Sequence, residues 1–174
     1  MSTRKNSSLI THELLLHDAA SQGDERKLDD LKVFVKRGKF DINFKDEDWG
    51  SRTALHCASE RGHLRCCKFL LEGGADPSAR MSMGWTPAHC AAEGGHLSVI
   101  RLLAESGGTV NAKDDYGDTP KMIAVRYGHK ECTEYLQSIE HFPEQRKELL
   151  KETFQYAIKK KIKENQMASK TNGE

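Results

Sequence analysis

Histidine and cysteine are the residue types of this 174-residue sequence that could do chemistry, because both bind metals and both act in catalysis. Two H-x-x-C pairs, His63 with Cys66 and His129 with Cys132, suggest zinc ligation. A tetrahedral zinc site needs four ligands that converge, and these pairs lie 66 residues apart. The five cysteines form no C-x-x-C pair, and an odd number cannot close into a full set of intrachain disulfides. We therefore expect reduced thiols in the cytosol or nucleus.

A period of 33 residues runs through the sequence and gives these residues another role. Cys57 and Cys90 align with Ile123 at that offset, and Cys66 aligns with Val99. Positions that exchange with isoleucine and valine are core positions, so the cysteines are predicted to pack rather than to react. Three further markers keep the same register: Thr53, Thr86 and Thr119; Gly62, Gly95 and Gly128; and His63, His96 and His129.

Three more histidines fall at one position of the same repeat. His56 and His89 align with Met122. Methionine could not replace a catalytic or metal-binding histidine, but it could replace a histidine that serves in packing. We expect these histidines to exchange hydrogen bonds with neighbouring backbone. A fourth copy, LLLHDAASQGDE, lies upstream and places His17 in the same register with six extra residues after it. Two of the six fall within residues 45–52, and this first unit is predicted to be an N-terminal cap.

The run T-P-L-H-x-A-A-x-x-G-H at this period resembles the ankyrin repeat. The resemblance implies an all-α solenoid of stacked helix pairs with projecting β-turn fingers, over residues 11–139. The expected repeats are 11–47, 48–80, 81–113 and 114–139. Local chemistry agrees, since each threonine can cap a helix, Pro87 and Pro120 suit the first helical turn, and the glycines can end it. Helices of eight or nine residues need stacking to persist.

The same resemblance implies a partner-binding surface on the fingers and the ends of the first helices, where the repeats differ most from one another. That surface mixes aromatic and charged side chains, which are common in binding hot spots. Trp85 has an alternative role, as a cover for the base of its own finger. The predicted binding residues are Trp49, Arg52, Glu60, Arg61, Met83, Trp85, Glu93, Tyr116, Asp118, Arg126 and Tyr127.

Composition excludes several other function classes. Lysine and arginine number 27 against 26 acidic residues, so no bulk charge attracts nucleic acid or a membrane. No phosphate loop, nucleophile elbow or metalloprotease motif is present, and we expect no enzyme activity, cofactor, metal or small-molecule substrate. The expected partner is another protein, bound by a chain that is monomeric when free. With no secretory or membrane-spanning segment in the sequence, we expect a cytoplasmic protein, with an additional nuclear location left open.

The last part of the chain has a different composition. Within 140–166, Leu150, Phe154, Ile158 and Ile162 recur every four residues, which predicts an amphipathic helix. The helix is expected to cap the last repeat. Its basic cluster at 159–163 leaves open a tether to anionic membrane or nucleic acid, or a nuclear import signal.

Two minor expectations complete the sequence analysis. Residues 1–10 and 167–174 are predicted to be disordered. By resemblance to similar repeats, Asn43 and Asn111 at the finger entrances are candidates for hydroxylation.

Overall fold

Short helices in pairs build the molecule. A computed structural model describes residues 12–37 and 41–140, and across these ranges it contains eight α-helices, two 3-10 turns and no strand. Their bounds are α1 (His12–Gln22), α2 (Glu25–Lys36), η1 (Glu47–Trp49), α3 (Ala54–Glu60), α4 (Leu64–Glu72), η2 (Ser82–Gly84), α5 (Pro87–Glu93), α6 (Leu97–Glu105), α7 (Pro120–Arg126) and α8 (Lys130–Glu140).

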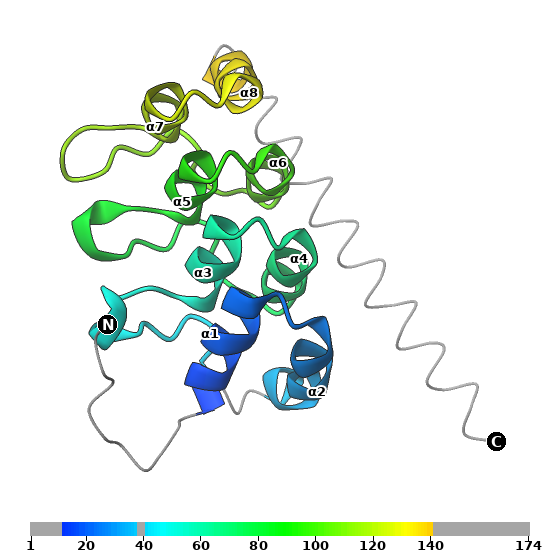
Figure 1. Ribbon diagram of the computed structural model, residues 1–174. Helices are drawn as coiled ribbons and strands as arrows, with labels where there is room; N and C mark the ends of the chain where they lie inside the picture. The colour runs from blue at the N-terminus through cyan, green and yellow to red at the C-terminus, as the bar shows by residue number, and fades with distance from the viewer. Residues whose placement is uncertain (1–11, 38–40, 141–174) are drawn as a thin grey trace.

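The helices form two parallel columns (Figure 1). The first helices α1, α3, α5 and α7 stack in one column and the second helices α2, α4, α6 and α8 in the other. Fingers project from the side of the first-helix column. The all-α solenoid expected from the sequence is confirmed. The predicted helix beyond α8 and the two predicted disordered ends lie outside the described residues.

Each inner first helix begins at the threonine that the sequence marks. Thr86 is the N-cap of α5 in extended backbone, and Pro87 follows in the first turn. The backbone N–H of Thr86 donates to Nδ1 of His89 at 3.1 Å, so the His89 proton sits on Nε2. Thr53 and His56 repeat this capping box at α3. The predicted helix starts are confirmed, and the helices are seven residues long, even shorter than expected.

The other nitrogen of each capping histidine reaches the next repeat. Nε2 of His56 donates to the Trp85 carbonyl at 3.2 Å, and Nε2 of His89 donates to the Asp118 carbonyl at 3.2 Å. In the first repeat, His17 Nε2 lies 2.9 Å from the Arg52 carbonyl oxygen. The backbone hydrogen bonding predicted for these histidines is confirmed, and each bond fastens one repeat to the residue that precedes the next threonine.

The cysteines lie in the core, as their alignment with isoleucine and valine predicted. All five are buried and free, together with their counterparts Val99 and Ile123. Burial raises the pKa of Cys57 and Cys90 to about 12, so both thiols stay neutral at physiological pH and are poor nucleophiles. Packing is therefore their role in this core.

A second row of histidines covers the glycines that end the first helices. Gly95 has a φ of +72°, and a Cβ built on it would lie 2.5 Å from Nδ1 of His129 in the next repeat. The same ring donates from Nε2 to the Glu93 carbonyl at 2.8 Å. Two separate constraints therefore require glycine at position 95: the left-handed backbone conformation and the close approach of the His129 ring. Gly128 has a similar φ of +78° but nothing within 4 Å of its Cβ position.

The pair Gly95 and Gly128 separates these two requirements. We expect Gly128→Ala to lower the free energy of unfolding by roughly 1–2 kcal/mol, the cost of a left-handed backbone in a non-glycine residue. Gly95→Ala should cost about 1–3 kcal/mol more, because the His129 ring must also move. Urea unfolding of both variants measures the difference. Equal losses would show that the histidine contact contributes nothing.

Stability should fall on mild acidification. Burial lowers the pKa of His56 from 6.5 to about 4, and burial also lowers the pKa of His89. The unfolded chain therefore binds more protons than the folded chain between pH 6.5 and 4, and stability is lost as the pH falls through that window. From pH 7 to pH 5 we expect His56 alone to cost on the order of 2 kcal/mol. Urea unfolding at both pH values should give a smaller loss for a His56→Gln, His89→Gln variant; an unchanged loss would contradict the assignment.

Candidate binding surface

Each finger closes through one backbone hydrogen bond at its base. The N–H of Asp46 donates to the Arg52 carbonyl at 2.9 Å, and equivalent bonds join Met81 to Trp85 at 2.8 Å and residue 114 to residue 118 at 2.9 Å. Five residues separate the partners in the first finger and three in the others. The two extra residues predicted within 45–52 thus lie between Asp46 and Arg52, in the segment that contains η1.

The three fingers are hydrogen-bonded to one another. The N–H of Ser82 donates to the Gly50 carbonyl at 3.0 Å, and the N–H of Asp115 donates to the Met83 carbonyl at 3.1 Å. Arg80 braces the second contact, with its guanidinium 2.9 Å from the Lys113 carbonyl and 3.6 Å from the Asp115 carboxylate. The tips therefore form one continuous row, which we call the finger row (residues 46–52, 81–85 and 114–118).

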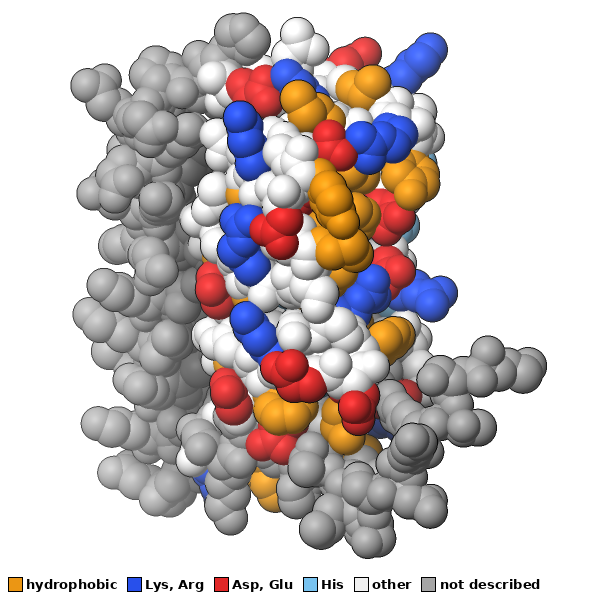
Figure 2. Space-filling model, turned by 90° about the vertical axis from the view of Figure 1, so that its left-hand side faces the viewer, with side chains coloured by type: hydrophobic (Ala, Val, Ile, Leu, Met, Phe, Trp, Pro, Cys, Tyr) orange, Lys and Arg blue, Asp and Glu red, His pale blue; other side chains and the backbone are white. Residues whose placement is uncertain are grey.

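The finger row exposes large apolar side chains. Trp49 is 41% exposed, Met83 51% and Tyr116 76%, and Tyr127 at the end of α7 is 53% exposed. Viewed from the finger side, apolar side chains gather in a band with acidic and basic side chains beside it (Figure 2). Four of the predicted binding side chains are therefore exposed to solvent. Whether a partner contacts them remains a prediction.

Most charged residues predicted for this surface are paired with one another. The guanidinium of Arg52 contacts the Glu60 carboxylate and lies 5.5 Å from the centre of the Trp49 ring. Arg126 contacts Asp118 at 2.6 Å. Because residues 52 and 118 are equivalent, as are 60 and 126, the same ion pair occurs twice with its polarity reversed.

The other two charged residues of the predicted set, Glu93 and Arg61, differ in their surroundings. Glu93 accepts a hydrogen bond from the Tyr127 hydroxyl at 2.9 Å, which joins two repeats across the surface. Arg61 is exposed at the end of α3.

Trp85 is half-buried and joins two fingers. Its indole N–H donates to Oδ2 of Asp114 at 3.0 Å, and its ring stacks on His89 with centroids 5.9 Å apart. Oδ1 of Asp114 accepts from the N–H groups of Tyr116 and Asp118, both at 2.9 Å. Although burial opposes ionisation, these hydrogen bonds lower the pKa of Asp114. Trp85 thus contacts the base of the following finger, and the sequence analysis missed Asp114 as the residue that holds it.

The described part of the chain contains no cluster of side chains that could bind a metal ion. Residues 12–37 and 41–140 contain no group of three histidine, cysteine or acidic side chains that could hold an ion. Cys66 and Cys132 are buried in the core, while the His63 and His129 rings contact the glycines of the preceding repeats. None of the helices in these ranges is long and apolar enough to cross a bilayer.

The stacked helix pairs, the capping histidines and the hydrogen-bonded fingers define a repeat solenoid with an exposed finger row. A family model described as ankyrin repeats in three copies matches residues 16–114 and 74–148, which is well over half of the chain. The chain belongs to the ankyrin-repeat family. Ankyrin repeats are in general protein–protein interaction modules.

Several curated proteins are similar over part of the repeat stack. Palmitoyltransferase akr1 of Schizosaccharomyces pombe is 48% identical over 61 residues, 35% of this chain and 9% of that protein. The 26S proteasome non-ATPase regulatory subunit 10 of Rattus norvegicus is 39% identical over 61 residues, 35% of this chain and 26% of that protein. Human ankyrin repeat domain-containing protein 7 is 42% identical over 57 residues, 33% of this chain and 20% of that protein. The matched stretch is thus about a quarter or less of each relative.

The indole hydrogen bond of Trp85 can be tested with a single substitution. Trp85→Phe keeps a ring on His89 but removes the donor to Asp114, so we expect a loss of about 1–2 kcal/mol in unfolding free energy. Hydrogen exchange at residues 114–118 should become faster. Trp49→Phe, at an exposed ring, is the matched control and should change stability by less than about 0.5 kcal/mol. Equal effects of the two substitutions would rule out a structural role for the Trp85 N–H.

Proposed function

We propose that this chain is a non-catalytic adaptor, scaffold or inhibitor that holds a partner protein on its finger row and first helices. The general role of ankyrin repeats supports a protein partner. The observation that carries the choice of surface is the backbone of Met83. Its φ is +62°, in the left-handed region that costs a non-glycine residue roughly 1–2 kcal/mol.

The equivalent position shows that this strain is not required by the finger. Gly50 lies 33 residues earlier, with a φ of +71°, and meets the same backbone demand at this position without strain; the first finger has its own non-glycine residue at positive φ one position later, Ser51 at +57°. The second finger therefore carries a strained methionine where glycine would fold more easily, and half of its side chain is exposed. Strain that folding does not need is typical of functional positions. Methionine also adapts its shape to an apolar partner surface.

The finger row suits a partner with an apolar contact surface. Its carbonyl and amide groups are hydrogen-bonded between fingers, so Trp49, Met83 and Tyr116 are held in place before binding and lose little entropy on binding. Because Arg52 is paired with Glu60, the electrostatic attraction of this surface for a strongly charged partner is weak. We infer that the chain binds as a monomer in the cytoplasm or nucleus, and that it needs no small molecule.

A test on Met83 separates binding from folding. Met83→Gly removes the side chain and relieves the strained backbone, so the unfolding free energy should stay within about 1 kcal/mol of wild type. Partner affinity should fall roughly tenfold, as for an interface residue that contributes about 1.4 kcal/mol. Crosslinking mass spectrometry from the native cell type identifies the partner, and titration of that purified partner measures the affinity.

The matched control lies on the other helix column. Val33 of α2 is 51% exposed, as Met83 is, so Val33→Ala removes a comparable exposed apolar side chain. It should leave the affinity unchanged. Equal affinities for Met83→Gly and wild type would show that the partner does not use this finger.

The alternative function, a tether to anionic membrane or nucleic acid, depends on the basic cluster at 159–163. That cluster lies outside the described residues, so the tether stays a prediction from the sequence. Salt-dependent binding to anionic vesicles or oligonucleotides would favour it.

A further inference from the structure

The last repeat exposes positions that the inner repeats bury. Ser59 and Ala92 are fully buried, whereas the equivalent Val125 is 59% exposed. His89 is fully buried, whereas the equivalent Met122 is 48% exposed. In the inner repeats these positions face the following repeat. The outward side of α7 therefore has the geometry of a stacking face.

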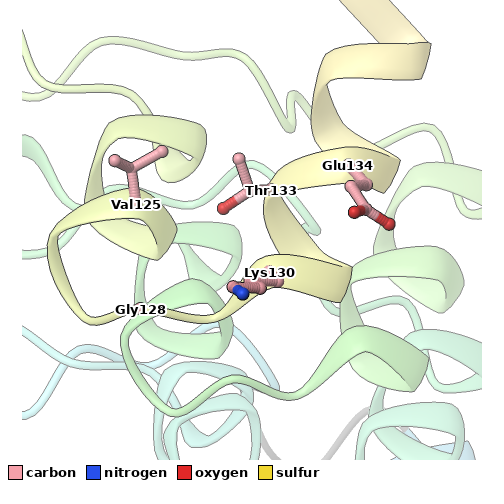
Figure 3. Close-up of a pocket in the computed structure, with 5 residues that line it drawn as sticks. All are labelled: Val125, Gly128, Lys130, Thr133 and Glu134. Carbon is pink, nitrogen blue, oxygen red and sulfur yellow. The ribbon is translucent and has the colours of Figure 1, made fainter.

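A hollow lies on the same side of the last repeat. It measures about 300 Å³ and lies between α7 and α8 (Figure 3). Its lining includes Gly128, whose counterpart Gly95 is covered by a histidine of the next repeat, and Thr133, whose counterpart Ile100 is fully buried. The hollow is thus the place where a further element of the stack would sit. We call this surface the end face (Met122, Val125, Gly128 and Thr133).

Met122 and Val125 keep part of the end face apolar, beside the polar Thr133, Lys130 and Glu134 that line the hollow. A solenoid that ends in water needs polar residues on its outer side. Here the polar His89 position becomes Met122, and the small Ala92 position becomes the larger Val125. Met122 cannot bond to a following backbone carbonyl as the histidines do, so the face suits an element with apolar side chains and no repeat finger. These substitutions indicate that the end face packs against an element other than another ankyrin repeat.

We propose that residues 143–165 of the same chain cover the end face as an amphipathic helix. This segment has the matching pattern, with the apolar residues Leu150, Phe154, Ile158 and Ile162 at four-residue intervals. It is also near, because Pro143 is three residues beyond the end of α8 at Glu140. A helix of 23 residues is about 34 Å long, twice the length of α8, and can return along α8 to reach the hollow.

Charge and tethering favour this segment over a separate molecule. The acidic residues of α8 are Glu131, Glu134 and Glu140, against Lys130, and Glu140 is paired with Lys121 of α7. Residues 141–174 carry 8 basic residues against 5 glutamates. A segment joined by a short turn also has a high effective concentration at the end face, which a second copy of the chain lacks.

Hydrogen exchange of the full chain tests the proposal. Amides between 148 and 165 should be protected in the wild type, and Val125→Glu should speed their exchange roughly tenfold, since burial of one apolar side chain is lost. Val33→Glu is the matched control, an exposed valine on α2 that should leave these amides unchanged. Protection within α3–α6 should persist in both variants, which shows that the stack remains folded. Unprotected wild-type amides, or protection insensitive to Val125→Glu, would overturn the proposal.

A second measurement identifies the occupant. Sedimentation velocity and exchange should be independent of protein concentration when the cover belongs to the same chain. Dimers whose dissociation removes the protection at 148–165 would assign the end face to a second copy and overturn the proposal. Phe154→Glu should act like Val125→Glu, and the double variant should lose little more than either one, because both remove the same contact.

Discussion

The rest of the structure depends on the hydrogen bonds of the buried histidines. First helices of seven residues are too short to persist alone, and a buried imidazole must have both nitrogens satisfied. His89 meets both conditions, because one nitrogen caps its own helix at Thr86 and the other binds the next repeat at Asp118. Helix formation and repeat stacking are therefore one event. The carbonyls so fixed belong to residues 52, 85 and 118, where each finger ends, and the core in this way sets the geometry of the finger row.

Residues that recur at the 33-residue period explain how much of the structure could be predicted from the sequence. Thr86 caps a helix, Gly95 allows a left-handed turn and Cys90 fills a core volume. Each of these requirements recurs between repeats, so internal alignment of the sequence identifies the residues. The contact of Trp85 with Asp114 joins two fingers and has no periodic marker, and only its three-dimensional placement reveals it. The left-handed backbone of Met83 was equally hidden, because methionine gives no sequence signal for positive φ.

The finger row and the adjoining first helices combine a hydrogen-bonded backbone with paired charges. Arg52 with Glu60 and Arg126 with Asp118 neutralise each other, so these groups orient their neighbours more than they attract a distant partner. A partner bound at this surface, as proposed, would be recognised by shape and apolar contact, and long-range electrostatics would not accelerate its association. The reversed polarity of the two pairs gives the surface a direction, with an arginine on the finger side in one repeat and on the helix side two repeats later.

The end face bears on the size of the molecule in solution. A stacking face at one end of a repeat array can accept the first repeat of another copy, and such a head-to-tail contact is heterologous and has no reason to close. Repetition of that contact would build a filament. The first unit departs from the repeat consensus at Leu14 and Leu15, which makes it a poor continuation of the stack. Were residues 143–165 to cover Val125 and Met122 as proposed, the exposed end face would be closed to this contact and no filament would grow from it.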